Sequence, residues 1–527
     1  MTDTFLTPGL LLVIGIAAPW LAALLLLPIS RSAHRWLAPI ATVGFAVPAL
    51  IALVLWIQFD PSRAGEFQFL IDYPTGLEYF LGVSLKLGLN GISLPLYLLA
   101  AWVGLAAGLY SLKGTVKASP QYLVLLLVMQ GGMMGMFAAI DLFFFYFFHE
   151  VALIPTFIMM AGWGSSGRRA AAMTMAIYLT IGAMLSLGGL IALYHFSGAE
   201  SFDIISLKAV LVSQPLSDSL QSLLFGILVF GFGILVSLWP LHNWAVPTYA
   251  KAPTGAAMLH AGVLKNFGLY GLIQFAIPCL PLGALAWGDL ILYLALGNVL
   301  IIGWVTMAQP ELKQMVAYSS VMHIGYVFLG AASLSIVAVN GAVLLMVGHG
   351  LSIALLLMLS TALHHRSGTF IMDEMGGLAR KMPILAVLFV MGSLASIGLP
   401  GFANFWGELT IFIGLWGYEP WIAILAMLGI VISAIYALRA LAKVFFGKAN
   451  EGAVSDAKLV STDLSWGERI PAFLLIFALL AIGLWPKMIA DPLNNAVEAL
   501  YSTSNIMSDD SQSTKPLVHN LLEEEKL

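Results

Sequence analysis

The chain has little charge and almost no cysteine. Only 9% of its 527 residues are charged, whereas about 25% are charged in an average soluble protein. Cys279 is the one cysteine, which excludes an internal disulfide, a cysteine-ligated iron–sulfur cluster and a CxxC haem site. Basic residues form no stripe, so nothing indicates nucleic-acid binding. The opening residues MTDTFLTPGLLL contain no Lys or Arg, so we expect a retained helix there and no cleaved signal peptide.

Long apolar runs dominate the sequence. Hydrophobic residues make up 60% of the chain and gather in runs of about 20 residues, the length at which a helix crosses a bilayer. We therefore predict an all-α polytopic membrane protein, with one transmembrane domain over residues 1–501 and a polar tail over 502–527. About fourteen spans are expected, at 8–28, 36–58, 91–111, 121–140, 142–162, 170–195, 219–239, 254–276, 285–308, 314–335, 338–363, 383–415, 420–446 and 470–490.

Lys and Arg concentrate in alternate loops. One set of loops carries little beyond Arg63, Lys86 and Lys208. By the positive-inside rule the other, richer set is cytoplasmic, and an even number of spans then puts both termini on the non-cytoplasmic side. The basic residues of the richer set are Arg31, Arg35, Lys113, Lys117, Arg168, Arg169, Lys251, Lys313, Arg366, Arg380, Lys381, Lys448, Lys458 and Arg469.

Two spans contain sequences that break helices. Pro240 lies in SLWPLHNWAVP and Pro400 lies in ASIGLPGFANFWGEL. Proline removes an amide donor and displaces a carbonyl acceptor, and membrane proteins tolerate such a break where it is buried in protein or lines a wet cavity. The breaks are about five spans apart. This spacing suggests two inverted five-helix repeats, over about 121–276 and 285–446.

Three charged residues stand in the middle of apolar spans: Glu150, Lys265 and Glu408. A charge at the bilayer centre costs at least ~3 kcal/mol by insertion scales, so such residues usually mark a path for protons or ions. Desolvation lets Lys265 lose its proton near neutral pH, and for Glu150 desolvation and a cationic neighbour would act in opposite directions. Glu408 follows a helix break that water can reach, so we expect it at the exit or coupling end of a proton path. The alternative is a structural role, in which the group is hydrogen-bonded or neutral at a helix interface.

Four histidines accompany these charges. His323 and His349 lie in two further spans, His149 precedes Glu150, and His260 lies one and a half turns before Lys265. Imidazole donates and accepts, and its unperturbed pKa of about 6.5 suits a proton relay. Each histidine alone could instead be a packed core residue. Metal binding is the alternative for the set, but no two of these groups have ligand spacing on one helix face.

Ordered blocks of the sequence resemble the antiporter-like membrane subunits of respiratory complex I, and most of all the chain 4 (subunit M) type of NADH–quinone oxidoreductase. The resemblance runs from about Leu87 to Lys448. Mrp-type cation/proton antiporter subunits share several blocks and are the alternative. The blocks are LGLNGISLPL, HEVALIPTFIMMAGWG, PLHNW, KAPTGAAMLHAGVLKNFGLYGL, AQPELKQMVAYSSVMHIGYVFLG, GHGLSIAL, MDEMGGLARKMP and GLPGFANFWGEL.

The resemblance implies two fused half-channels along a hydrophilic axis that carries protons. In that family Glu150 matches the glutamate of the fifth helix, Lys265 the lysine of the eighth, and Glu408 the acidic residue of the broken twelfth. His323 and His349 match the histidines of helices ten and eleven.

The resemblance also implies a non-redox subunit of a translocase. NAD(P)H or ferredoxin, iron–sulfur clusters and quinone are expected in other subunits, and no cofactor, metal or redox site is expected in this chain. GWGSSG at 162–167 matches the GxGxxG pattern but follows no strand, so it is not a dinucleotide site. The expected partners are other membrane subunits and the lipid bilayer. The expected location is a bacterial plasma membrane or a thylakoid membrane.

One departure from the family concerns the seventh helix. The family has a lysine there that pairs with the fifth-helix glutamate, but alignment on PLHNW puts Leu235 at its place, and no Lys or Arg lies between Ser219 and His242. Glu150 thus lacks its customary partner. Either His149 or His260 substitutes, or the first half-channel works differently, or the subunit pumps poorly and is mainly structural.

Overall fold

The structure is a computed structural model that describes residues 7–28, 35–113, 119–447 and 462–502. The tail expected beyond Ser502 and the basic residues Arg31, Lys117, Lys448 and Lys458 lie outside the described residues. Within them, twelve helices are long and apolar enough to cross a membrane. They are α1 (Pro8–Leu26), α2 (Leu37–Gln58), α4 (Ser93–Lys113), α5 (Pro120–Ala138), α6 (Leu142–Trp163), α7 (Arg168–Ser197), α9 (Asp218–Val236), α14 (Pro281–Gly297) continued through η5 (Asn298–Ile302) and α15 (Gly303–Ala308), α16 (Leu312–Ala332), α17 (Ile336–Ser367), α20 (Pro420–Leu441) continued by η8 (Ala442–Phe446), and α21 (Trp466–Leu484).

Two further crossings are divided into shorter helices. One is a helical run in which α-helix alternates with π-helix, and the other is α18 (Pro383–Ile397) followed after a break by α19 (Ala403–Tyr418). With these two the count reaches the predicted fourteen, and we number the crossings in chain order. The run is the eighth crossing and consists of α11 (Thr254–Leu259), η3 (His260–Leu264), α12 (Asn266–Gly271), η4 (Leu272–Ala276) and α13 (Ile277–Cys279).

Both predicted helix breaks are present. In the seventh crossing α9 ends at Val236, the chain passes through Ser237 at φ +77° and a cis Trp239–Pro240 bond, and α10 (Ala245–Lys251) resumes the helix. In the twelfth crossing the break includes Gly398 at φ +82° and Gly401 at φ +99°, where a residue without Cβ is favoured. The breaks confirm the broken-helix expectation, while the exact repeat boundaries stay a prediction.

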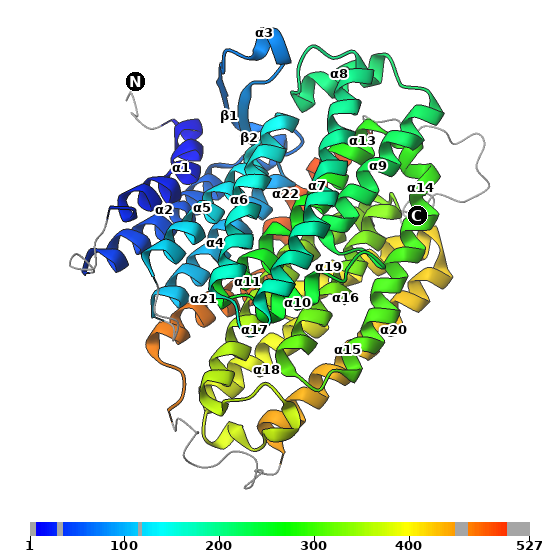
Figure 1. The fold of residues 1–527 in the computed structure, drawn as a ribbon. Coiled ribbons are helices and arrows are strands. Elements are labelled where there is room, and N and C mark those ends of the chain that lie inside the picture. The colour runs from blue at the N-terminus through cyan, green and yellow to red at the C-terminus, as the bar shows by residue number, and fades with distance from the viewer. Residues whose placement is uncertain (1–6, 29–34, 114–118, 448–461, 503–527) are drawn as a thin grey trace.

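Short elements that the sequence did not predict lie outside the crossings. The antiparallel strands β1 (Gln68–Tyr73) and β2 (Leu85–Leu89) form a hairpin that carries α3 (Glu78–Leu81), so the fold is nearly all-α and not wholly so. In Figure 1 this hairpin and α8 (Ile204–Ser213) project from the same end of the bundle. The remaining short turns are η2 (Pro61–Arg63), η6 (Met372–Glu374) and η7 (Leu378–Arg380).

The expected end of the last crossing was wrong. We predicted a span over 470–490, but α21 ends at Leu484 and a separate helix, α22 (Lys487–Ser502), follows. The sequence Trp485–Pro486 separates the two helices, because the residue before a proline is disfavoured in helical conformation. The buried residues of α22 lie at helical spacing on one face, so α22 packs along the protein and is not a continuation of the crossing: Ile489, Pro492, Leu493, Ala496, Val497 and Tyr501.

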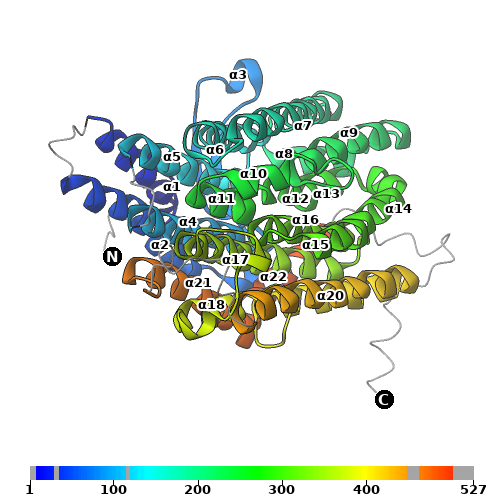
Figure 2. The ribbon, with the colours of Figure 1, turned by 60° about the horizontal axis from the view of Figure 1, so that its bottom comes forward.

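The crossings form one bundle with α17 at its centre. The apolar stretch of α17 is wholly buried, whereas less than half of that of α1, α2, α7 and α20 is buried. Figures 1 and 2 show α1 and α2 at one flank and α14 and α20 at the opposite flank. A helix this enclosed holds its side chains away from lipid, so α17 can present polar groups only to other protein elements.

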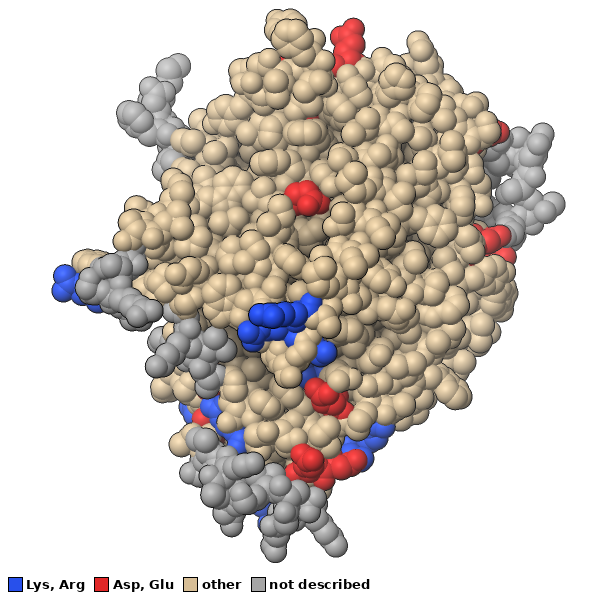
Figure 3. Space-filling view, viewed as in Figure 1, with Lys and Arg blue, Asp and Glu red and all other residues tan. Residues whose placement is uncertain are grey.

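Both ends of the described chain meet at the end of the bundle that bears the hairpin. A Cβ on Gly9, in α1, would meet Ile71 of β1, and Nδ2 of Asn495, in α22, donates to the carbonyl of Pro61 at 3.0 Å. An even number of crossings requires this arrangement. On the face in Figure 3, the visible Lys and Arg side chains lie from mid-height towards the opposite, lower end, and the charged side chains visible at the upper end are Asp and Glu.

A buried row of ionisable groups as the candidate functional site

Lys265 lies inside the bundle at the end of the π-helical turn η3, with 2% of its surface exposed. Its ammonium contacts the hydroxyl of Ser320 on α16, and its Nζ lies 3.1 Å from Nε2 of His349 on α17. Oγ of Ser320 lies 3.0 Å from the same nitrogen. The eighth, tenth and eleventh crossings thus meet in a triangle of one amine, one hydroxyl and one imidazole. π-helical turns are rare and often occur at functional sites.

This triangle constrains where protons can be. An ammonium only donates hydrogen bonds, so Nε2 of His349 must accept from a charged Lys265. A charged imidazole at 3.1 Å from a charged amine would be repelled in a buried site. The pair is therefore not expected to hold two positive charges at once, and a single proton could reside on either group. Such an arrangement can pass a proton between neighbouring crossings.

His323 on α16 lies next to His349 in space. The two rings are stacked with centroids 5.5 Å apart, and both side chains are buried. Nδ1 of His323 lies 2.7 Å from the carbonyl oxygen of Ser319, and because a carbonyl only accepts, Nδ1 must carry the hydrogen. The ring also approaches the backbone of Ser396, in the last turn of α18. His323 thus connects the triangle to the edge of the twelfth-crossing break.

Glu408 is the last ionisable group on this side of the bundle. We call the buried or partly buried groups Glu150, His149, His260, Lys265, His349, His323 and Glu408 the row. Glu408 lies on α19 with 3% of its surface exposed, and its carboxylate covers Gly398 so closely that a Cβ there would overlap it. Tyr326 and Tyr436 lie within electrostatic range. Among the described protein groups, Oε1 of Glu408 has no hydrogen-bond partner. Buried polar atoms are normally hydrogen-bonded to protein or to ordered water. The carboxylate thus lies beside the helix break at Gly398, and its role in a proton path stays a prediction.

The other half of the row includes Glu150 on α6, and Asp141 determines where this helix begins. The carboxylate of Asp141 caps this helix by accepting from the amides of Phe143 and Phe144, and it also accepts from the amide of Ser84 at 3.1 Å. Burial raises the pKa of the Asp141 carboxyl to about 6, although these amide donors oppose the shift. The cap fixes where α6 begins, and with it the depth of Glu150.

Glu150 and His149 point to different sides of α6. His149 is buried and stacks on Phe267 of α12, with ring centroids 3.9 Å apart. Its Nδ1 lies 3.4 Å from Oε1 of Glu150, whose side chain is 27% exposed. His260 lies within electrostatic range of both His149 and Lys265, and its ring stacks on Trp244 beside the seventh-crossing break. The two candidate substitutes for the missing lysine therefore lie between Glu150 and Lys265.

Helix α9 of the seventh crossing contains no Lys or Arg. Leu235, which stands where the family has lysine, is buried with 3% of its surface exposed. Phe232 on the same helix packs edge-on against Phe267. The half around Lys265 and Glu408 is thus rich in polar contacts, whereas aromatic rings fill the space around His149.

The sequence did not single out several polar groups of the row. Ser320 contacts both Lys265 and His349, and Nδ2 of Asn404, at the start of α19, donates to Oγ of Ser352 at 3.3 Å. The signal that could have found Ser320 is its position three residues before His323, on the same face of α16. Small hydroxyl residues are common in buried helices, so their presence alone is not informative.

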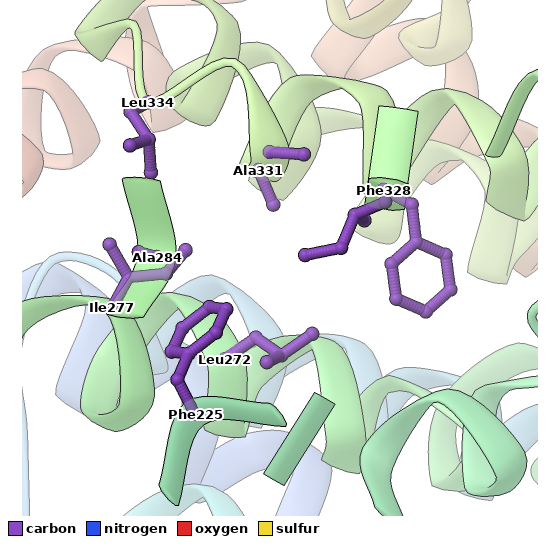
Figure 4. A pocket seen from close by; sticks show the side chains of 9 residues that line it. Phe225, Leu272, Ile277, Ala284, Phe328, Ala331 and Leu334 are labelled. Carbon is purple, nitrogen blue, oxygen red and sulfur yellow. The ribbon is translucent and has the colours of Figure 1, made fainter. Parts of the chain in front are cut away.

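Two other features lie apart from the row. A small cavity lined by apolar side chains such as Phe225, Leu272 and Phe328 lies between crossings (Figure 4), and it offers no polar group to a proton or ion. Among the described residues, no group of three or more His, Cys, Asp or Glu side chains could hold a metal ion. The metal alternative thus gains no support from the geometry.

These observations define a class: a polytopic helical membrane protein with two broken helices and buried titratable groups inside the bundle. Residues 139–433 match the family described as NADH:quinone oxidoreductase/Mrp antiporter, TM, and the chain belongs to this family. The family inferred from the sequence blocks is thereby confirmed.

Individual relatives agree with this assignment. The chain is 33% identical to the NAD(P)H-quinone oxidoreductase chain 4 1 of Picosynechococcus sp., over 90% of this chain and 88% of that relative. It superposes on a chain of the respiratory complex I from Thermus thermophilus with a TM-score of 0.83 and 30% identity, covering 94% and 99% of the two chains. A chain of the Mrp complex from Dietzia sp. gives a TM-score of 0.80 at 18% identity, covering 95% and 99%, which shows a shared fold.

Proposed function

We propose that this chain is the proton-translocating membrane subunit of a complex I-like NAD(P)H- or ferredoxin-quinone oxidoreductase. The observation that carries the proposal is the contact of Lys265, Ser320 and His349 within a buried row that reaches Glu408. Membership of the family and 33% identity to a quinone oxidoreductase chain 4 support the kind of complex. The neighbours would be other membrane subunits of that complex, within a bacterial plasma membrane or a thylakoid membrane.

In the proposed path a proton from the cytoplasmic side reaches Lys265 near the broken seventh crossing. It passes to His349 directly or through the hydroxyl of Ser320, then to His323, and leaves from Glu408 at the broken twelfth crossing. Each transfer is favoured when the next group loses its own proton, because two like charges repel at these separations. Both termini would lie on the non-cytoplasmic side, opposite the basic loops.

Redox chemistry belongs elsewhere in the proposed complex. The subunit itself would hold no NAD(P)H, ferredoxin, iron–sulfur cluster or quinone, and would respond to quinone reduction through changes in the protonation of its row. Coupling of this kind needs neighbouring subunits whose charges alter the proton affinity of Glu150, Lys265 or Glu408. The protein's contribution is thus positioning and electrostatics.

The experiment is proton uptake driven by substrate oxidation in inverted membrane vesicles that contain the assembled complex. Lys265→Ala should lower uptake at least ~10-fold while the amount of assembled complex stays unchanged. Lys443→Ala is the matched control, because Lys443 forms an exposed ion pair with Asp373 and contacts none of the residues of the proposed path. Full uptake in the Lys265 variant would overturn the proposed path.

A Mrp-type cation/proton antiporter subunit is the second candidate, favoured by the fold it shares with the Mrp chain. The same vesicles discriminate the two. Uptake that depends on quinone reduction supports the first function, whereas proton movement that requires a Na⁺ gradient and no electron donor supports the second. Genes for quinone-site and iron–sulfur subunits beside this one would also favour the first.

A further inference from the structure

A second set of buried polar side chains continues along the eighth crossing beyond Lys265. Asn266 follows Lys265 directly, and Tyr270 and Gln274 come four and eight residues after Asn266. Residues four apart lie on one side of a helix, with their Cβ atoms about 5–6 Å from each other. At most 1% of the surface of each of these three side chains is exposed. The proposed path through His349 uses none of them.

The beginning of α4 meets this set from the other side. Nδ2 of Asn90 donates to Oε1 of Gln274 at 3.3 Å, and the side chain of Ser93 lies near the hydroxyl of Tyr270. Asn90 and Ser93 also hold each other, because the amide of Ser93 donates to Oδ1 of Asn90 and the amide of Asn90 donates to Oγ of Ser93, each at 2.9 Å. We call the following five residues the polar stripe: Asn90, Ser93, Asn266, Tyr270 and Gln274.

The polar stripe leads from Lys265 toward the end of the bundle that bears the hairpin. Its three members on the eighth crossing extend over eight residues, or about 12 Å along the helix axis. Asn90 comes directly after β2 of the hairpin. A Cβ on the next residue, Gly91, would overlap Pro492 of α22. The stripe therefore ends beneath α22, at the end of the bundle where both termini of the described chain lie.

Within the chain, the polar stripe is incompletely hydrogen-bonded. Among the described groups, Oδ1 of Asn266 and Nε2 of Gln274 have no partner. An unpaired polar group costs roughly 1–3 kcal/mol when it is buried, so such atoms are normally paired with protein or with ordered water. One water molecule can bond to two groups that lie about 5–6 Å apart. The spacing of the stripe thus suits a file of water molecules, each held between successive side chains.

Aromatic rings border the polar stripe. Phe137 of α5 and Phe145 of α6 pack against the ring of Tyr270, with centroids 5.5 Å and 5.8 Å away. Phe275 packs against the same ring at 5.4 Å. These apolar rings offer water no strong hydrogen bond, so they confine it to the stripe.

We propose that the polar stripe binds a file of ordered water through which Lys265 exchanges protons with the end of the bundle beneath α22. The stripe is then a second outlet beside Glu408, and its role in transport rests on the proposed function. The three amide side chains hold the water in position. The hydroxyl of Tyr270 can accept a proton from one water molecule while it donates its own to the next, so it passes the proton on without a net change of charge.

Radical labelling tests for the water itself. When X-rays split water in the purified complex, hydroxyl radicals modify aromatic side chains beside ordered water, and mass spectrometry measures the products. Tyr270 should be modified at least several-fold faster than Tyr97, an equally buried tyrosine of α4 for which the described residues provide no hydrogen-bond or electrostatic partner. Equal rates for the two residues would overturn the proposal.

Removal of one hydroxyl tests whether the file carries protons. Tyr270→Phe keeps the ring that packs on Phe137, and it should lower proton uptake in vesicles several-fold while the amount of assembled complex stays unchanged. Tyr97→Phe is the matched control and should keep full uptake. Gln274→Leu removes a water-binding amide and should act like Tyr270→Phe. Full uptake in both stripe variants would show that the stripe is no outlet.

A double variant separates this outlet from the one at Glu408. Two parallel outlets predict that Glu408→Gln retains part of the uptake and that Glu408→Gln with Tyr270→Phe retains less. The absence of a further loss in the double variant would contradict a second outlet. Labelling of Tyr270 requires no electron donor. Fast labelling in a complex without quinone-driven uptake would therefore support the water file and sink only the proposed function.

Discussion

Nζ of Lys265 and Nε2 of His349 are 3.1 Å apart although 84 residues separate them in sequence. The contact joins the eighth crossing to α17, whose apolar stretch is wholly buried. Water has little access there, so a charge on either group would be weakly screened and would respond strongly to charges nearby. We therefore expect a change of charge nearby to shift a proton from one group towards the other.

Removal of His349 should impair this exchange more than removal of Ser320. His349→Ala takes away the one imidazole among the described residues that is within hydrogen-bond distance of Lys265, and we expect proton uptake to fall at least ~10-fold. Ser320→Ala leaves the 3.1 Å contact in place, so uptake should fall by a smaller factor. The measurement is initial uptake rate in vesicles, normalised to assembled complex. Equal losses in both variants would indicate that the hydroxyl is an obligatory step.

Gly398→Ala should displace Glu408. A Cβ at residue 398 would overlap the Glu408 carboxylate, and the positive φ adds backbone strain of roughly 1–2 kcal/mol. We expect lower uptake and a lower unfolding temperature. Gly401→Ala is the control, since it has the same sign of φ but no atom within 4 Å of its added Cβ. Equal proton uptake in the two variants would show that the close approach of Gly398 to Glu408 does not affect transport.

The buried ion pair of Arg366 and Glu468 should matter for stability and not for transport. Its closest atoms are 2.7 Å apart, both side chains are below 10% exposed, and the pair joins α17 to α21. Arg366→Met leaves a buried carboxylate unpaired, which costs about 3–5 kcal/mol. Thermal unfolding of the purified complex should show the loss.

The matched variant for this pair is Arg366→Met with Glu468→Leu. The double change removes both charges, so it should recover much of the stability that the single change loses. A double variant as unstable as Arg366→Met alone would show that the packing of Arg366, and not its charge, is the important contribution. Uptake per assembled complex should stay normal in both.

His260→Phe tests whether a histidine stands in for the missing lysine. Phenylalanine can keep the stacking on Trp244 but has no nitrogen to bind a proton. If His260 relays protons between His149 and Lys265, uptake should fall several-fold at unchanged assembly. His364→Phe, at the end of α17 where that ring stacks on Phe370, is the control. Unchanged uptake in the His260 variant would assign the residue to packing.

The sequence predicted the crossings and both breaks because these depend on local properties. A run of about 20 apolar residues must cross a bilayer as helix, whatever its neighbours are. Pro240 and Pro400 interrupt helices through their own geometry. The sequence did not predict the hairpin of β1 and β2, because these strands are short. It also predicted the wrong end for the last crossing, because the apolar run at α21 continues past Pro486 into residues that fold as α22.

The candidate site was foreseen in its residue types more than in its contacts. Glu150, Lys265, His323, His349 and Glu408 stood out because ionisable groups are costly in hydrocarbon. Their roles as proton carriers remain predictions. The sequence offered no means to choose which histidine meets Lys265, and Ser320 was overlooked because a serine carries no such cost.

The sequence by itself determined the family, the number of crossings, the broken helices and the absence of a lysine at Leu235. The tertiary structure decided that His349 rather than His323 or His260 contacts Lys265, and that Glu150 is partly exposed while the adjacent His149 is buried. The physical reason is that helical periodicity fixes which residues share a face. Which element that face meets depends on packing between segments far apart in the chain.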